Sequence, residues 1–181
     1  MRVGAHARLK PLTSVVPALS LIVFALIATL PWGLSADVAY LPPLLVLALI
    51  FCWSVRYPGL MPPLLVFLAG IGVDVVTASP IGFWSFLFLA GYAAALRVSR
   101  FAQDRPTITM ILTYPVVALL IGALAWLFAS VYFSRFMEWQ PVMESLKIAV
   151  LACPAIAWLT RLLNGLMVAA PAAGSHTAET A

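Results

Sequence analysis

Few residues in this chain could do chemistry inside an apolar environment, and Asp74 is the clearest of them. A charged side chain within a membrane helix is costly, so its presence suggests a function. Asp74 could end its helix near water and accept hydrogen bonds from the free N–H groups where the next helix starts at Pro80. It could instead bind a polar group of a partner, or hold an ion or a proton. No second buried acid is expected beside it, which argues against the ion or proton site.

The patterns typical of enzymes and of cofactor-binding proteins are absent from the sequence. His6 and His176 lie near the two ends of the chain, so neither can assist a buried nucleophile or share a metal ion. There is no glycine-rich phosphate-binding loop and no Cys/His cluster with zinc spacing. Cys52 and Cys153 fall within apolar runs and are expected to pack as small apolar residues rather than form a disulfide. We therefore expect no enzyme activity, no cofactor and no metal site.

The composition places the chain in a membrane. Of its 181 residues, 64% are hydrophobic and 9% are charged, and the mean hydropathy is +1.08. A soluble domain is about a quarter charged, so this chain lacks the polar residues needed to cover a water-exposed surface. Its apolar content also excludes a disordered chain. The net charge of +4 is too small for a nucleic-acid-binding surface.

Apolar runs of about 20 residues, the length of a membrane-spanning helix, follow one another along the chain. They predict an all-α integral membrane protein, a compact bundle of about six transmembrane helices in a single domain at 15–170. A basic cytoplasmic arm at 1–14 precedes the first run, which is too long for the apolar part of a signal peptide and is expected to remain as a helix. A flexible cytoplasmic tail is expected at 171–181. The predicted spans are 15–34, 38–55, 60–76, 80–96, 107–133 and 145–170.

The positions of Lys and Arg predict the orientation. With the N-terminus in the cytoplasm, only Arg135 and Lys147 fall on the outer side, as the positive-inside rule favours. The chain is thus expected to cross the bacterial inner membrane several times, with both termini cytoplasmic. Arg97, Arg100 and Arg105 form a cytoplasmic basic cluster. This cluster could contact anionic lipid or an acidic partner, or serve orientation alone.

The segment from Phe51 to Tyr92, about a quarter of the chain, has a distinctive pattern of residues: Pro58, Gly70, Gly72, Asp74, Pro80, Gly82 and Tyr92. In this pattern the segment resembles the MreD family of rod shape-determining membrane proteins. That family has a similar length, several spans and a Gly-rich helix that ends in Asp, followed by a short Pro-Gly turn and a tyrosine in the next helix. The second glycine of the segment departs from the family's Gly-Leu-Leu-like pattern without changing the spacing to the aspartate.

This resemblance implies a non-enzymatic scaffold of the cell-elongation (rod) complex, or elongasome. The protein would pair with MreC, which has a single membrane helix, and link the MreB filament to peptidoglycan synthesis by RodA and its class B transpeptidase partner. Small residues let helices approach closely, so Gly70 and Gly72 are expected to form one face for a partner helix. Leucine at either position is expected to weaken that association without unfolding the bundle.

A second hypothesis is a substrate-binding membrane subunit of a small-solute, vitamin-type transporter. Such subunits have about this size and six helices. This hypothesis predicts a ligand pocket that opens to the outside, with Asp74 and the 134–145 loop near its mouth. It also requires polar residues on the outer halves of several helices, and the sequence offers only Asp74, Glu138 and Glu144.

Overall fold

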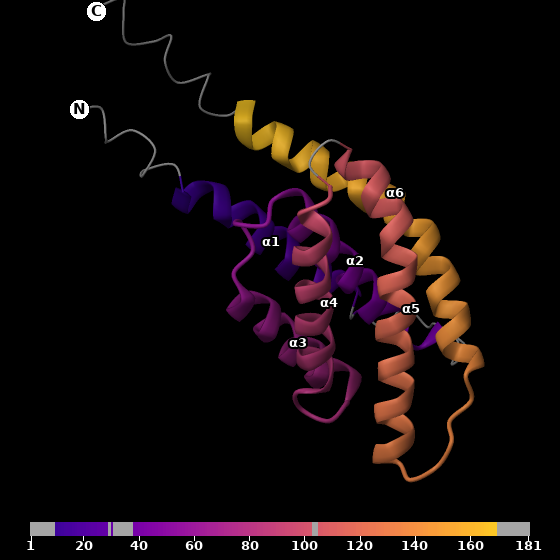
Figure 1. Cartoon of the computed structure of the whole chain (residues 1–181). Helices are drawn as coiled ribbons and strands as arrows, with labels where there is room; N and C mark the ends of the chain where they lie inside the picture. The colour runs from indigo at the N-terminus through magenta and orange to yellow at the C-terminus, as the bar shows by residue number, and fades with distance from the viewer. Residues whose placement is uncertain (1–9, 29, 31–37, 103–104, 170–181) are drawn as a thin grey trace, which may run out of the picture.

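The computed structural model describes residues 10–28, 30, 38–102 and 105–169, and in this part of the chain the regular structure is entirely helical (Figure 1). The long helices lie side by side, and short connections join α3 to α4 and α5 to α6 (Figure 1). The described helices are α1 Lys10–Ala28, α2 Leu41–Arg56, α3 Pro63–Thr77, α4 Phe83–Ser99, α5 Pro106–Tyr132 and α6 Gln140–Ala169.

Prolines stand in the first turns of most of the described helices, and three of these helices show it most clearly. The prolines of these three helices stand in the first turn of α2, at the first residue of α3 and at the first residue of α5. At these positions the missing N–H breaks no helical hydrogen bond, and the fixed φ angle favours the helix. Pro115 and Pro154 lie inside α5 and α6, which both continue past them. Neither proline therefore ends its helix.

Most helix ends lie within three residues of the predicted spans, but α1 ends at Ala28 rather than at 34, and two helices start five residues early. The helix α1 begins at Lys10, so the last residues of the predicted arm at 1–14 are helical. The helix α6 begins at Gln140 rather than at 145, so Glu144, assigned to the preceding loop, is helical and pairs with Lys147 at 2.8 Å. The arm up to residue 9 and the tail at 171–181 lie outside the described residues.

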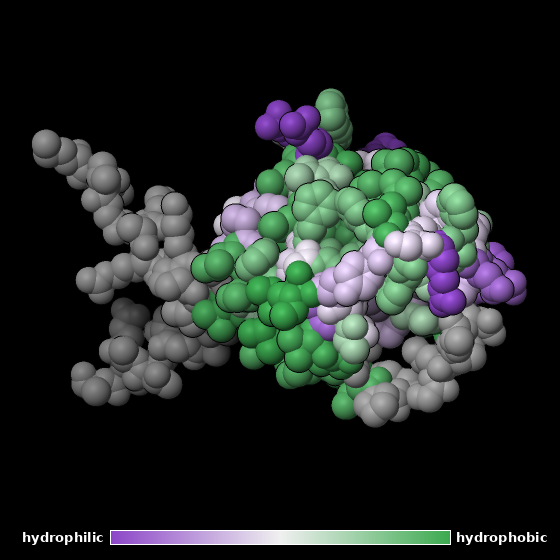
Figure 2. All heavy atoms as spheres, turned by 90° about the horizontal axis from the view of Figure 1, so that it is seen from below, coloured by the Kyte–Doolittle hydropathy of each residue, from purple (hydrophilic) through white to green (hydrophobic). Residues whose placement is uncertain are grey.

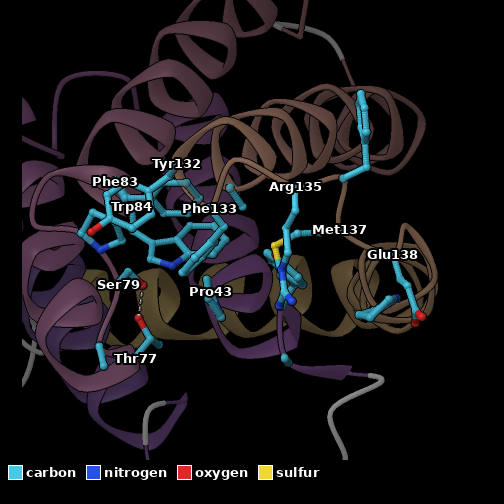
Figure 3. Close-up of a pocket in the computed structure, with 17 residues that line it drawn as sticks. Pro43, Thr77, Ser79, Phe83, Trp84, Tyr132, Phe133, Arg135, Met137 and Glu138 are labelled. Carbon is cyan, nitrogen blue, oxygen red and sulfur yellow. Dashed lines mark hydrogen bonds between the residues drawn. The ribbon is translucent and has the colours of Figure 1, made fainter.

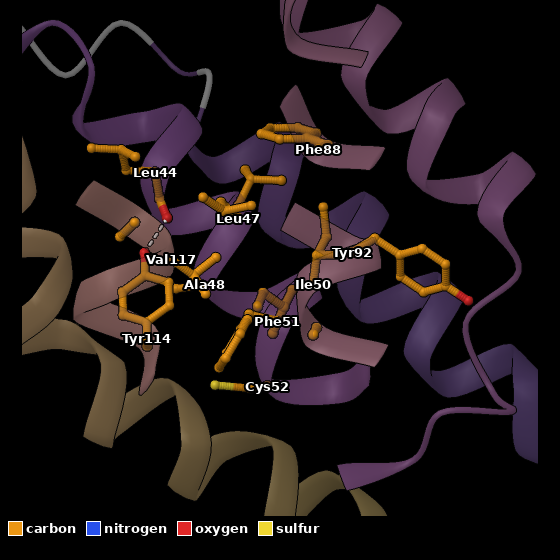
Figure 4. Close-up of a cluster of buried hydrophobic side chains, with 14 of the residues drawn as sticks. Leu44, Leu47, Ala48, Ile50, Phe51, Cys52, Phe88, Tyr92, Tyr114 and Val117 are labelled. Carbon is orange, nitrogen blue, oxygen red and sulfur yellow. Dashed lines mark hydrogen bonds between the residues drawn. The ribbon is translucent and has the colours of Figure 1, made fainter. Parts of the chain in front are cut away.

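The core of the bundle is built around α2. Every residue of α2 from Pro43 to Val55 is buried or nearly so, and the helix packs against α1, α4, α5 and α6. A helix that is apolar on all sides must be surrounded in this way. One hydrogen bond fixes its start: the fully buried Tyr114 hydroxyl of α5 donates to the Leu44 carbonyl at 2.8 Å (Figure 4).

The two ends of the bundle differ in charge. At one end, called here the arginine end, lie Arg56, at the close of α2, and the α4–α5 connection with the predicted basic cluster. The Arg56 side chain joins α2 to α5 there by donating to the Thr107 hydroxyl at 2.8 Å. At the other end, the hairpin end, lie the α3–α4 and α5–α6 connections (Figure 1). The positive-inside rule predicts that such an arginine end faces the cytoplasm.

Two helices are long and apolar enough to cross a bilayer by length and composition: α5, and α6 over Gln140–Gly165. Four shorter apolar helices accompany them: Val15–Ile27 of α1, and α2, α3 and α4. Large hydrophobic side chains face outward, for example Leu64 at 67% exposed and Leu151 at 79%. Seen from the hairpin end, hydrophobic residues cover most of the surface (Figure 2). Such a surface suits lipid rather than water.

Candidate functional site

The carboxylate of Asp74 connects α3 to α4 at the hairpin end. Its side chain is fully buried near the end of α3. One oxygen accepts from the Gly82 N–H and the other from the Trp84 N–H, both at 2.8 Å. These N–H groups belong to the first turn of α4, where helical donors lack partners and a negative charge is favoured. The hydrogen bonds expected from the sequence are therefore present, and both carboxylate oxygens are occupied.

The backbone between the two helices is shaped to reach this carboxylate. Ala78 adopts a left-handed conformation with φ 51°, and the Ser79 N–H donates to the Asp74 carbonyl at 3.0 Å. A second turn follows, closed by the Phe83 N–H donating to the Pro80 carbonyl at 3.0 Å. Gly82 is the third residue of this four-residue turn, and its φ of 96° is a value that favours glycine. Pro80 and Gly82 thus form the turn that brings the α4 donors to Asp74.

Gly70 and Gly72 lie on opposite sides of α3, and this corrects the expectation of a shared face. Residues two apart on a helix point in different directions. A Cβ at Gly70 would lie 2.6 Å from the Ser85 backbone nitrogen and closer still to its Cα, so Gly70 permits the close approach of α4. The Ser85 hydroxyl donates to the Phe67 carbonyl at 3.1 Å across the same contact. Gly72 is exposed, with no atom near an added Cβ.

Tyr92, in the middle of α4, connects this helix to the segment that precedes α3. Its buried hydroxyl donates to the Met61 carbonyl, in the α2–α3 connection, at 2.9 Å. Pro58 is exposed in the same connection. The buried motif residues Gly70, Asp74 and Tyr92 therefore all hold the α3–α4 pair in place.

The predicted basic cluster surrounds the α4–α5 connection. Arg97 lies in the last turn of α4, Arg100 directly follows that helix, and Arg105 directly precedes α5. All three are exposed, and none forms an ion pair with another described residue. Positive charge at a helix C-terminus is favourable, so Arg97 and Arg100 also stabilise the end of α4.

A cavity of about 610 Å³ opens at the hairpin end (Figure 3). Three segments distant in sequence form its wall: the start of α2, the α3–α4 connection and the α5–α6 connection. The charged residues in the wall are Arg135 and Glu138. Asp74 does not line the cavity, but residues 77–80, a few positions further along the chain, do. Six of the 17 residues that line it are aromatic: Tyr40, Phe83, Trp84, Tyr132, Phe133 and Phe136.

The transporter hypothesis predicted a pocket near Asp74 and the 134–145 loop, and the cavity lies beside both. Its aromatic wall and the place of Arg135 in it were not predicted. The available signal was the predicted topology, which already put residues 35–37, 77–79 and 134–144 on one side of the membrane. In the described part of the chain, no group of three His, Cys, Asp or Glu side chains could hold a metal ion. The arrangement offers packed helices, an exposed apolar surface and one concave site.

These features define a helical protein of the membrane type, with a buried aspartate fixing a helical hairpin. A family model described as rod shape-determining protein MreD matches residues 10–165 of this chain. The chain therefore belongs to the MreD family, a membrane protein family with a structural role in rod shape determination. No curated protein and no solved structure matched the chain.

Proposed function

We propose that this protein is a non-enzymatic scaffold of the rod complex. In this proposal it crosses the bacterial inner membrane six times, with both termini in the cytoplasm. It pairs with MreC and links the MreB filament to peptidoglycan synthesis by RodA and its class B transpeptidase partner. The family match over residues 10–165 is the observation that carries the proposal.

The exposed face of α3 is the surface we assign to the membrane helix of MreC. Gly70 is excluded because α4 already occupies its side of the helix. The opposite side presents Leu64, Leu68, Gly72 and Val75, all exposed and spaced by three or four residues. Such a stripe lies on one face of a helix. The small residue in its middle lets a second helix approach closely, which favours association in lipid.

The arginine end is the side we assign to the cytoplasm. Arg97, Arg100 and Arg105 are exposed there and lack described ion-pair partners. In the proposed orientation they contact anionic lipid, or an acidic surface of a cytoplasmic component such as the MreB filament.

Co-purification with MreC tests the proposed pairing. The full chain is tagged and extracted from its native membranes in mild detergent, and the MreC that it retains is quantified. We expect Gly72→Leu to reduce MreC recovery several-fold, because the larger side chain separates the helices. Ala155→Leu is the matched control, since Ala155 is an exposed small residue on the distant helix α6. Absence of MreC from the wild-type preparation contradicts the pairing, and equal recovery with both variants contradicts the assignment to α3.

The transporter-subunit hypothesis has one observation in its favour, namely the cavity at the hairpin end. In the proposed orientation this cavity opens to the outside, beside the α5–α6 connection. Six of its 17 lining residues are aromatic and two are charged, however, whereas a polar solute requires several converging polar groups. Recovery of ATPase subunits or of a bound small solute with the purified protein would support this second function instead.

A further inference from the structure

The proposed scaffold function assigns no role to the cavity at the hairpin end, and the wall of this cavity has a definite chemical character. Six aromatic side chains, a single cation and a single anion contribute to it. Figure 3 shows the Arg135 side chain extending from the α5–α6 connection toward Pro43, while the Glu138 carboxylate points away from it. No described carboxylate forms an ion pair with Arg135. Among the described residues, the cavity thus combines a largely apolar wall with a positive charge that has no ion-pair partner.

The backbone around this cavity is conformationally unusual. In the described residues, positive φ angles occur at Ala78, Gly82 and Ser134, and all three stand in the α3–α4 and α5–α6 connections, which line part of the cavity. Ser134 has φ 51°, and the next N–H, that of Arg135, donates to the Ser130 carbonyl at 3.1 Å. This hydrogen bond fixes where the Arg135 side chain leaves the backbone. Left-handed residues other than glycine are costly, and they concentrate at functional sites.

We propose that this cavity binds the phosphate-bearing headgroup of an anionic membrane lipid. Arg135 supplies the charged hydrogen-bond donors, since a guanidinium group matches the geometry of a phosphate. The N-terminal end of α6 adds a positive helix dipole, because Pro141 of its first turn lines the cavity and that turn contains no acid. The aromatic rings contact the glycerol and the first part of the acyl chains.

Three features select a lipid over other ligands. The volume of about 610 Å³ lies within the range of small-molecule sites. The rings of Tyr40, Trp84 and Tyr132 line the same wall, and Tyr and Trp are the side chains typical of the membrane–water interface. Next to the cavity, the surface of α5 is apolar and exposed at Phe128 and Val131, so acyl chains can leave the cavity along this helix.

Native mass spectrometry of the full chain tests this proposal. The protein is delipidated in detergent and mixed with equal amounts of phosphatidylglycerol and phosphatidylcholine that have identical acyl chains. We expect the wild type to retain phosphatidylglycerol preferentially. Arg135→Gln is expected to weaken that retention about tenfold, the effect of one charged hydrogen-bonding partner. Lys147→Gln is the matched control, because it removes a positive charge from the same side of the bundle outside the cavity.

A second variant tests the cavity without changing charge. Ala39 lines the wall and is exposed, so Ala39→Trp should fill the space and reduce the retention of both lipids. Inorganic phosphate is added as a competitor, and we expect it to displace phosphatidylglycerol poorly because it lacks the acyl chains. The proposal is overturned if the wild type shows no preference or if Lys147→Gln acts like Arg135→Gln. Unchanged binding in Ala39→Trp, or full displacement by free phosphate, overturns it as well.

Discussion

Replacing Asp74 tests whether its carboxylate acts as a helix cap. In Asp74→Ala, the Gly82 and Trp84 N–H groups lose their acceptor in a buried place, at about 1–3 kcal/mol each. The charge at the start of α4 is lost too, at about 0.3–1 kcal/mol. Asp74→Asn keeps one acceptor oxygen but turns an NH₂ group toward the other donor, so it should cost about half as much. We therefore expect roughly 4 kcal/mol for alanine and roughly 2 kcal/mol for asparagine.

Thermal unfolding of the purified full chain in mild detergent measures the stability that each of the two variants loses. At about 2–4 °C per kcal/mol for a chain of this size, Asp74→Ala should lower the melting temperature by roughly 10 °C and Asp74→Asn by about half of that. Glu138→Gln is the control, because this exposed carboxylate lies at the same end and its loss should change stability by less than about 0.5 kcal/mol.

The capping argument is refuted if asparagine and alanine destabilise the protein equally, or if neither does. Rescue of rod shape in cells that lack the protein gives an independent readout. A cap predicts that Asp74→Asn restores rod shape better than Asp74→Ala does. If Asp74→Asn folds normally but fails to restore rod shape, the negative charge itself is required. That result would favour the interpretation that Asp74 binds a polar group of a partner, or an ion.

Three further predictions concern stability and use the same unfolding assay. Gly70→Ala should lower the melting temperature clearly, because the added methyl group would clash with α4. Gly72→Ala should be neutral or stabilising by up to about 1 kcal/mol, because its side of α3 is open. Equal effects of the two variants would contradict the conclusion that only Gly70 faces α4. Ala78→Gly should stabilise by about 1 kcal/mol, because glycine adopts φ 51° without steric cost, and a loss of stability would contradict this. Tyr114→Phe should cost about 1 kcal/mol by removing the hydrogen bond to Leu44, and an unchanged melting temperature would show that this bond contributes little.

The parts of the structure that the sequence predicts depend on short-range order. Helix positions follow from apolar runs and from prolines in first turns, because both act within one helix. The hydrogen bonds of Asp74 were also predictable, since the residue and its donors are separated by a turn of only a few residues.

The parts that the sequence does not predict require contacts between distant segments. Whether Gly70 or Gly72 faces a neighbouring helix depends on the side of α3 on which α4 packs. The spacing of the two glycines along the chain does not predict that side. The Arg56–Thr107 hydrogen bond joins residues 51 positions apart. The cavity needs three connections to meet at one end, and no single segment shows a ligand-binding pattern. These features appear only when the helices are assembled.

The unequal lengths of the helices have a consequence for the surrounding bilayer. At 1.5 Å per residue, α3 with 15 residues and α4 with 17 measure about 23 and 26 Å, below the roughly 30 Å of a typical hydrocarbon core. The helix α5, with 27 residues, measures about 40 Å. In the proposed topology, lipids beside the α3–α4 hairpin must compress while α5 tilts to fit. The protein would then create a thinned membrane zone along α3, and such elastic deformation favours a partner helix of similarly short hydrophobic length at that face.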